Sequence, residues 1–270
     1  MEGGATPGPL WRDLLRAALA ALTVALLLRS TVAEPFAVPG GSMAPTLLDG
    51  DVVLVSRLAY GFKLPFADLT LLPLAIPRRG DVVVFKDPRD RARLLVRRVV
   101  GLEGDEVELR EQLLIVGGVV QQRLAAGERT YAERDEATGA IRFDTCRLFR
   151  ETLALGPLGG SPDDSAAEQA ESWSRARAAG AVGHDLLQCR RARPGRGEGP
   201  FGPVHRGHLF VLGDNRDRSN DGRDGRWQVP VEDVIGRVAL VGWGWGPGGW
   251  WFGGRTGQGV RFDRLLKPVE

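Results

Sequence analysis

The stretch VPGGSMAPTLLDGD, residues 38–51, decides how the rest of the chain is interpreted. Two glycines precede its central serine, Ser42, and glycine allows backbone conformations closed to other residues and close approach of a second chain. Prolines on both sides limit how the loop can move. A serine held in this way is a candidate nucleophile, whereas a surface turn is the alternative interpretation. The remaining sequence is needed to choose between them.

The composition is that of an ordinary folded protein. The chain has 270 residues, 43% hydrophobic and 26% charged, enough for one large or two modest domains. Its 36 basic residues nearly balance its 34 acidic ones, so nothing indicates nucleic-acid binding, which depends on neutralising phosphates. Only three basic residues are lysines, Lys63, Lys86 and Lys267. A chemistry that needs a neutral amine therefore has few positions to use.

One strongly apolar segment lies near the N-terminus. Residues 17–28 contain eleven apolar residues and one threonine. A membrane span needs about 20 mainly apolar residues, so the helix would begin near Leu10, with Arg12 and Arg16 at the interface. The flanking arginines weakly favour an N-terminus inside and the remainder outside. The alternative is a signal peptide cleaved after the small residues 31–33, and both interpretations export the rest of the chain.

Short β-branched runs follow the serine loop. They span residues 51–55, 81–85, 94–100 and 106–116, and Gly-Asp turns lead into the first two. Because no helical segments separate them, they predict a mainly antiparallel β fold. Between the first two runs lies an apolar loop, residues 58–79. It packs either in the core or against a membrane or hydrophobic substrate.

The middle of the sequence is less regular. Residues 119–155 indicate further hairpins, and the Gly-, Pro- and Arg-rich residues 156–203 indicate an excursion with one helix over 163–179. Cys146 and Cys189 either form one disulfide between excursion and sheet or stay unpaired, because spacing cannot establish geometry. No metal-binding spacing is present, and we assign no catalytic or ligand role to the three histidines.

The segment GDNRDRSNDGR, residues 213–223, is too polar for a buried strand. Its three Asp, three Arg, two Asn and one Ser indicate a loop stiffened by hydrogen bonds between side chains and backbone. Such a loop is either a solvated turn or a rigid wall beside an active site.

Four blocks, taken in order, resemble bacterial signal peptidase I. They are SMAPTLLDGD (42–51), RGDVVVFKDP (79–88), RRVVGLEGDEV (97–107) and GDNRDRSNDGR (213–223). The apolar segment before the serine and the terminal FDRLLKPV (262–269) are also similar to members of that family. Four matching blocks in one order are far more specific than a single motif.

The resemblance implies a membrane-bound serine endopeptidase that removes signal peptides from exported preproteins after small residues, with no metal or cofactor. It implies an antiparallel β catalytic domain with a smaller cap, preceded by one transmembrane helix. The protein would span the bacterial inner (plasma) membrane once, with its catalytic domain on the outer, periplasmic side. Its expected partners are signal peptides and the lipid bilayer, not nucleic acid, and we expect a monomer.

The resemblance also divides the chain. The predicted parts are a cytoplasmic tail (1–9), the anchor (10–32), the first part of the catalytic β core (33–118), the cap with its excursion (119–206) and the second part of the core (207–270). A tryptophan group near the end of the chain matches the membrane-facing rim of the family, since tryptophan prefers the lipid–water interface. It consists of Trp243, Trp245, Trp250 and Trp251.

In this family a serine hydroxyl attacks the scissile carbonyl, and a neutral lysine amine takes its proton. By position, Ser42 is the nucleophile, and its backbone N–H would help to hold the oxyanion. Met43 would help to shape the substrate groove. Ser219 matches the hydroxyl that orients the lysine, while Asp221 and Arg223 match a supporting ion pair.

Two positions depart from the family pattern. Arg97 occupies the lysine position, and a guanidinium, with a pKa above about 12 and no acceptor lone pair, cannot act as a general base at neutral pH. Gly40 stands where many members have a serine that assists the oxyanion, although other members carry glycine.

Three hypotheses follow from the departures. The first is an active peptidase in which water, Lys86 or another arrangement replaces the lysine, with Arg97 holding the carbonyl or the oxyanion. The second is a catalytically impaired homologue that binds signal peptides or exported chains. The third is a specialised processing protease for one substrate, such as a pilin.

Overall fold

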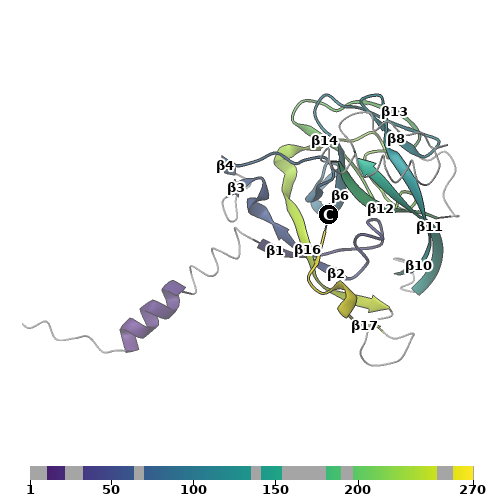
Figure 1. Cartoon of the computed structure of the whole chain (residues 1–270). Coiled ribbons are helices and arrows are strands. Elements are labelled where there is room, and N and C mark those ends of the chain that lie inside the picture. The colour runs from purple at the N-terminus through teal and green to yellow at the C-terminus, as the bar shows by residue number, and fades with distance from the viewer. Residues whose placement is uncertain are drawn as a thin grey trace, which may run out of the picture.

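The structure is a computed structural model that describes residues 11–21, 33–63, 70–134, 141–153, 181–189, 197–247 and 258–269. Residues 11–21 are helical, and the other regular elements in these ranges are strands and short 3₁₀ helices (Figure 1). The paired strands run antiparallel throughout the four sheets. The prediction of a mainly antiparallel β fold is therefore confirmed.

The largest sheet is organised around the long strand β16 (Val234–Pro247), which pairs with β2, β5, β17 and β18. Across the sheet the strand order is β1-β2-β16-β5-β6-β14-β15. The other bounds are β1 (Ala33–Ala37), β2 (Asp51–Ser56), β5 (Val82–Asp87), β6 (Asp90–Gly101), β14 (His208–Leu212), β15 (Val229–Pro230), β17 (Gln258–Arg261) and β18 (Lys267–Pro268).

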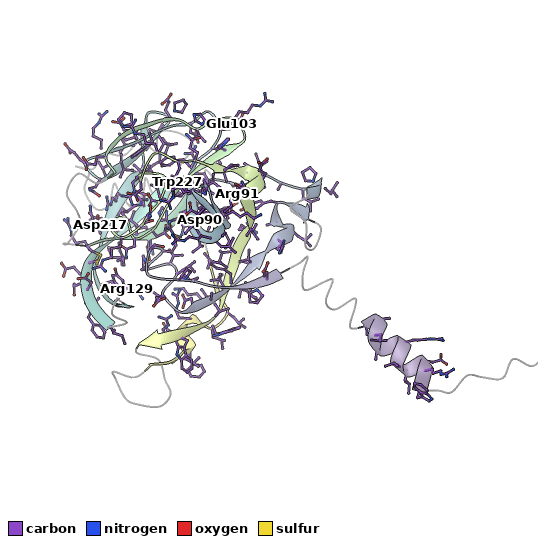
Figure 2. The ribbon with its side chains drawn as sticks, turned by 180° about the vertical axis from the view of Figure 1, so that it is seen from behind. Asp90, Arg91, Glu103, Arg129, Asp217 and Trp227 are labelled. Carbon is purple, nitrogen blue, oxygen red and sulfur yellow. A yellow bond between two sulfur atoms is a disulfide. The ribbon has the colours of Figure 1, made fainter. Side chains whose placement is uncertain are left out.

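The core is formed on both faces of this sheet. On β5, Val82 and Val84 join one apolar cluster, while Val83 and Phe85 join another on the opposite face. Trp227, labelled in Figure 2, is buried in the second cluster, with its ring centroid 6.2 Å from that of Phe85. Burying a side chain of this size contributes about 1.5–3 kcal/mol, so β5 holds the two faces together.

A smaller three-stranded sheet lies within the residues predicted to form the cap, and it is called the cap below. It consists of β10 (Gln122–Arg134), β11 (Ile141–Leu153) and β12 (Val182–Cys189), in that order. Cys146 and Cys189 lie directly opposite each other on β11 and β12 and form a disulfide. The disulfide alternative from the sequence is therefore confirmed.

A four-stranded sheet, β13-β7-β8-β9, packs against the main sheet and against Leu153 at the end of β11. Its strands are β7 (Glu106–Arg110), β8 (Leu113–Val116), β9 (Val119–Val120) and β13 (Gly199–Pro203). The prediction of one continuous strand over residues 106–116 was wrong. Glu111 and Gln112 have φ values of 50° and 68° and form a two-residue turn, which makes two strands of the run.

The apolar loop over residues 58–79 contains more structure than expected. It includes the 3₁₀ helix η1 (Arg57–Ala59) and a hairpin of β3 (Gly61–Lys63) and β4 (Thr70–Pro73). Leu72, Leu74 and Ile76 are exposed, so this part does not pack in the core. The helix predicted over 163–179 lies outside the described residues.

The predicted anchor, residues 10–32, is described only in part. Residues 11–21 are helical and exposed, and residues 22–32 lie outside the described ranges. Within those ranges, no helix is both long enough and apolar enough to cross a membrane.

Candidate active site

Ser42 lies half-buried in the loop between β1 and β2, where glycine is required. Gly40 has a φ of 74°, a conformation that favours glycine, and its N–H donates to the Asp49 carboxylate at 3.0 Å. Asn215 holds the loop from the other side: its backbone N–H donates to the Ser42 carbonyl and its side-chain amide to the Gly41 carbonyl, both at 3.0 Å. The serine therefore sits on a braced loop.

Arg97, from β6, points directly at this serine. Its Nη1 donates to Ser42 Oγ at 2.8 Å and to the Val96 carbonyl at 2.6 Å. Its Nε and Nη2 both donate to the Asn220 carbonyl, at 3.2 and 2.6 Å. Arg97 thus contacts the candidate nucleophile directly.

The charge of Arg97 follows from its surroundings. The residue is 4% exposed, and this burial lowers the pKa of the guanidinium to about 10, although the charge of nearby Asp221 acts in the opposite direction. At neutral pH the group is therefore a cation whose nitrogens only donate hydrogen bonds. It can stabilise negative charge on Ser42 Oγ, but it cannot take the serine proton.

Ser219 lies close to the serine loop, but its hydroxyl makes no hydrogen bond to the described residues there. Its hydroxyl is buried and has no hydrogen-bond partner in the part of the chain that the structure describes. Gly213 lies against it: a Cβ at that position would come within 2.2 Å of Ser219 Oγ and 2.6 Å of the Ser42 carbonyl oxygen. Gly213 therefore lets Ser219 approach the nucleophile loop, a requirement that the sequence analysis missed.

Asp221 and Arg223 form the predicted ion pair. Arg223 Nε and Nη2 donate to the two Asp221 oxygens at 2.7 and 2.9 Å, and the Gly213 N–H donates to the same carboxylate at 3.0 Å. Burial by itself would raise the pKa of Asp221, but Arg223 and its hydrogen bonds hold that pKa below the usual range. The pair fixes the last block beneath Ser219.

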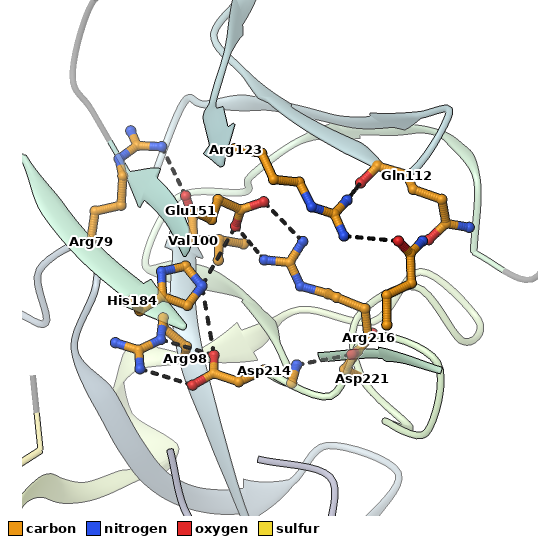
Figure 3. A network of polar contacts seen from close by, with 12 residues as sticks. Arg79, Arg98, Val100, Gln112, Arg123, Glu151, His184, Asp214, Arg216 and Asp221 are labelled. Atoms are coloured by element: carbon orange, nitrogen blue, oxygen red, sulfur yellow. Dashed lines mark hydrogen bonds and ion pairs between the residues drawn. The ribbon is translucent and has the colours of Figure 1, made fainter. Parts of the chain in front are cut away.

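A buried network joins this block to the cap (Figure 3). Arg98 donates to both Asp214 oxygens at 2.9 and 2.8 Å, and Thr46 of the serine loop donates to the same carboxylate at 2.5 Å. Glu151, from the cap strand β11, accepts from Arg216 of the last block. These two ion pairs and the Thr46 hydrogen bond hold the serine loop, β6, the last block and the cap in one arrangement.

Asn215 adds a second connection to the cap. Its side-chain amide donates to Tyr131 Oη at 2.8 Å, in addition to its bond with the serine loop. Its place inside the last block was the signal that could have identified it as a positioning residue.

Met43 and Lys86 occupy other surroundings. Met43 is fully buried in a core cluster with Val38 and Val96, so it supports the serine loop from beneath. Lys86 lies opposite Leu94, three positions from Arg97 on β6, and directly opposite residues share a face of the sheet. Lys86 and Arg97 therefore leave the sheet on opposite faces, which argues against Lys86 as the substitute base.

A half-buried serine on a braced loop, hydrogen-bonded to a charged side chain from another strand, has the layout of a candidate nucleophile with a partner group, although Arg97 is not a base. Comparison with known proteins identifies the protein family. The model of the family "Signal peptidase, peptidase S26" matches residues 11–243. The chain therefore belongs to the signal peptidase family, peptidase S26.

Several relatives of this chain are named signal peptidase I. That of Pseudomonas aeruginosa is 33% identical over 234 residues, covering 83% of this chain and 69% of the relative. That of Pseudomonas fluorescens is 33% identical over 238 residues, with the same coverage. That of Rickettsia typhi is 31% identical over 230 residues, covering 82% of this chain and 75% of the relative.

Proposed function

We propose that this protein is a serine endopeptidase that removes signal peptides from exported preproteins after small residues. The observation that carries the proposal is the 2.8 Å contact between Arg97 Nη1 and Ser42 Oγ, because it aligns the family's base position with the nucleophile. The ion pair of Asp221 and Arg223 and the nearby Ser219 hydroxyl support it, since each matches a part of the family's site.

In the proposed reaction, Ser42 Oγ attacks the scissile carbonyl carbon, and the C–N bond breaks as the peptide nitrogen takes a proton from water. A second water then hydrolyses the ester on Ser42 and releases the signal peptide. The serine proton goes to water, because the Arg97 cation cannot accept it. The Arg97 hydrogen bond stabilises the resulting alkoxide, and the Ser42 backbone N–H helps to hold the oxyanion. Since the alkoxide forms more readily as the pH rises, and the pKa of Arg97 is about 10, activity should increase from pH 7 to about pH 9, where the Arg97 cation still predominates.

A second candidate function is binding without turnover. It is favoured by the way that Arg97 is held: two backbone carbonyls accept its hydrogen bonds, while the Ser219 hydroxyl has no partner among the described residues. The site would then hold signal peptides or exported chains against an unreactive serine. A specialised processing protease, for instance for a pilin, would share the geometry of the first candidate.

The membrane anchor belongs to the same proposal. We infer that residues 10–32 span the bacterial inner membrane once, with the β domain on the outer side. Trp243 and Trp245 support contact with a bilayer surface, because each is 47% exposed on β16 and tryptophan favours the lipid–water interface. Extraction of membranes with alkaline carbonate tests the anchor: the full chain should stay in the pellet, and its release would contradict the proposal.

The function is tested by cleavage of a peptide that contains an Ala-X-Ala signal-peptide site, using the full chain in detergent between pH 7 and pH 9. The proposal expects cleavage that increases with pH and is lost in Ser42→Ala. Arg91→Lys is the matched control on β6, because Arg91 lies away from Ser42 and pairs with Asp233. Cleavage that persists in Ser42→Ala, or no cleavage at any pH, would contradict turnover by this serine.

A further inference from the structure

A cleft of about 730 Å³ lies between the main sheet and the cap. Gly80–Val82 and β18 line it from the main sheet, and Thr152 and β12 line it from the cap. Thr46 of the serine loop also lines it, whereas Ser42 and Arg97 are not among its described lining residues. The cleft is thus separate from the serine site but adjoins its loop.

The charged lining of this cleft is unbalanced. Four cations, Arg129, Arg150, Arg237 and Lys267, accompany only two described carboxylates, Asp81 and Asp185. Arg150 pairs with Asp185 at 2.9 Å, and Arg237 lies 3.7 Å from Asp81.

The other two cations, Arg129 and Lys267, have no acidic partner among the described residues. Arg129 extends from the cap strand β10, and Lys267 comes from β18 of the main sheet (Figure 2 labels Arg129). A negatively charged group in the cleft would therefore meet a cation from each wall.

Two buried polar side chains also border the cleft without hydrogen-bond partners in the described part of the chain. They are Thr152, through its hydroxyl, and His184, through both ring nitrogens. The nearest carboxylate oxygen to His184 Nε2 is that of Glu151, at 3.5 Å. Buried polar groups are normally satisfied, so unpartnered polar atoms behind this wall suit a polar occupant of the cleft better than an apolar one.

The cap strand β12 presents its edge to the cleft. It is the outer strand of the cap sheet and pairs there with β11. Consecutive residues 181–185 all line the cleft, whereas a strand that turned one face to it would contribute every second residue. An open strand edge can bind an extended peptide through backbone hydrogen bonds.

We propose that this cleft binds the mature part of the preprotein substrate as an extended segment that carries an acidic side chain. The proposal rests on the proposed function. The segment before the scissile bond of a signal peptide is apolar or small, so a cationic, polar cleft suits the segment after it. Thr46 is four residues from Ser42, which limits their separation to about 14 Å. An extended segment reaches Thr46 within about four residues, and the cations lie in the cleft that Thr46 borders, so we place the acidic side chain about four to six residues beyond the scissile bond.

Peptide binding to the full-length Ser42→Ala variant in detergent tests this without requiring turnover. Two fluorescent peptides share the Ala-X-Ala site and differ only by Glu or Gln five residues beyond the scissile bond. We expect the Glu peptide to bind about tenfold more tightly, because it meets two cations, and the advantage to shrink as salt is added. Adding Arg129→Gln and Lys267→Gln should abolish the advantage, and adding Arg91→Gln, which lies outside the cleft, should preserve it.

Equal affinity for the two peptides, no binding of either, or an advantage that survives the double substitution would overturn the cleft proposal. Binding of the variants to phosphatidylglycerol vesicles is measured as well. If the double substitution weakens vesicle binding while the two peptides bind equally, the cleft holds a lipid headgroup and the peptide proposal is wrong. Failure of the proposed function is recognised separately, as absence of cleavage by the unmodified chain, and it leaves the Glu-to-Gln affinity ratio measurable.

Discussion

Arg97 and Arg98 are neighbours on β6, both buried, but their surroundings differ. Arg98 meets the two oxygens of Asp214 and the Gly80 carbonyl, so its fork of donors is matched by a carboxylate. Arg97 meets only neutral acceptors among the described residues: two backbone carbonyls and the Ser42 hydroxyl. The comparison shows that the surroundings of position 98 match the charge and the donors of an arginine, whereas those of position 97 supply no opposite charge in contact with it.

The unused Ser219 hydroxyl sharpens this difference. It lies beside the serine loop with no partner in the described residues, while Arg97 turns its spare donors to Asn220. A lysine at position 97 would carry one compact ammonium group in place of the wide guanidinium. We expect such a group to take hydrogen bonds with Ser42 and Ser219 and to give up those with Asn220.

The largest effect on stability should come from removing the carboxylate that matches Arg98. Asp214→Ala leaves a buried cation without its partner, which costs about 3–5 kcal/mol. Urea unfolding of the full chain measures it. Glu34→Ala is the control, because Glu34 pairs with Arg57 at the surface and should cost under about 1 kcal/mol. Equal losses in the two variants would show that the Arg98 pair is not a stabilising feature.

His184 makes the Arg98 region sensitive to acid. Burial, followed by the nearby Arg98 charge, lowers the pKa of His184 to about 4. In the unfolded chain this histidine titrates near pH 6.5, so the unfolded state takes up a proton first as the pH falls. Stability should therefore decrease between about pH 6.5 and pH 4, by about 3 kcal/mol at most.

The free energy of unfolding, measured across this pH window, checks the expectation. His184→Leu should remove most of the decrease, and the control His205→Gln, at an exposed position, should retain it. A decrease of the same size in His184→Leu would assign the pH dependence to other groups.

The smallest expected effects are those of lysine substitutions at positions 97 and 98. Arg98→Lys loses the two-pronged contact with Asp214 and should cost about 2 kcal/mol of unfolding free energy. Arg97→Lys loses neutral hydrogen bonds and should cost about 1 kcal/mol or less. Thermal or urea unfolding of both variants gives the order. The reverse order would mean that position 97, not 98, is the one built for arginine.

The sequence predicted the local elements of the fold better than its long-range pairing. The strands at residues 51–55 and 81–85 were identified from β-branched runs, and the structure has them as β2 and β5. The central strand β16 was missed because glycines interrupt it. Gly244 and Gly246 leave room there for the Arg261 guanidinium, which would lie about 3 Å from a Cβ at either position.

For the site, the ordered blocks were enough to bring Ser42, Arg97 and Ser219 into one region. The buried network was not predictable, because Arg98, Glu151 and His184 are far apart in sequence and meet only through the packing of cap and core. The turn at residues 111–112 was missed because Glu and Gln are not the residues that favour positive φ. The division of the chain into tail, anchor, core and cap remains a prediction.

The central claim is that the site is intact apart from the base at position 97. The most direct test is kcat/KM for the Ala-X-Ala peptide at pH 8, comparing the unmodified chain with Arg97→Lys and with the control Arg91→Lys. A positioned general base is worth about 10²–10⁴-fold, so Arg97→Lys should raise kcat/KM by at least a hundredfold, and Ser42→Ala should abolish that gain. No gain in Arg97→Lys, with the variant folded, would contradict the claim and show that the departure from the family extends beyond one side chain.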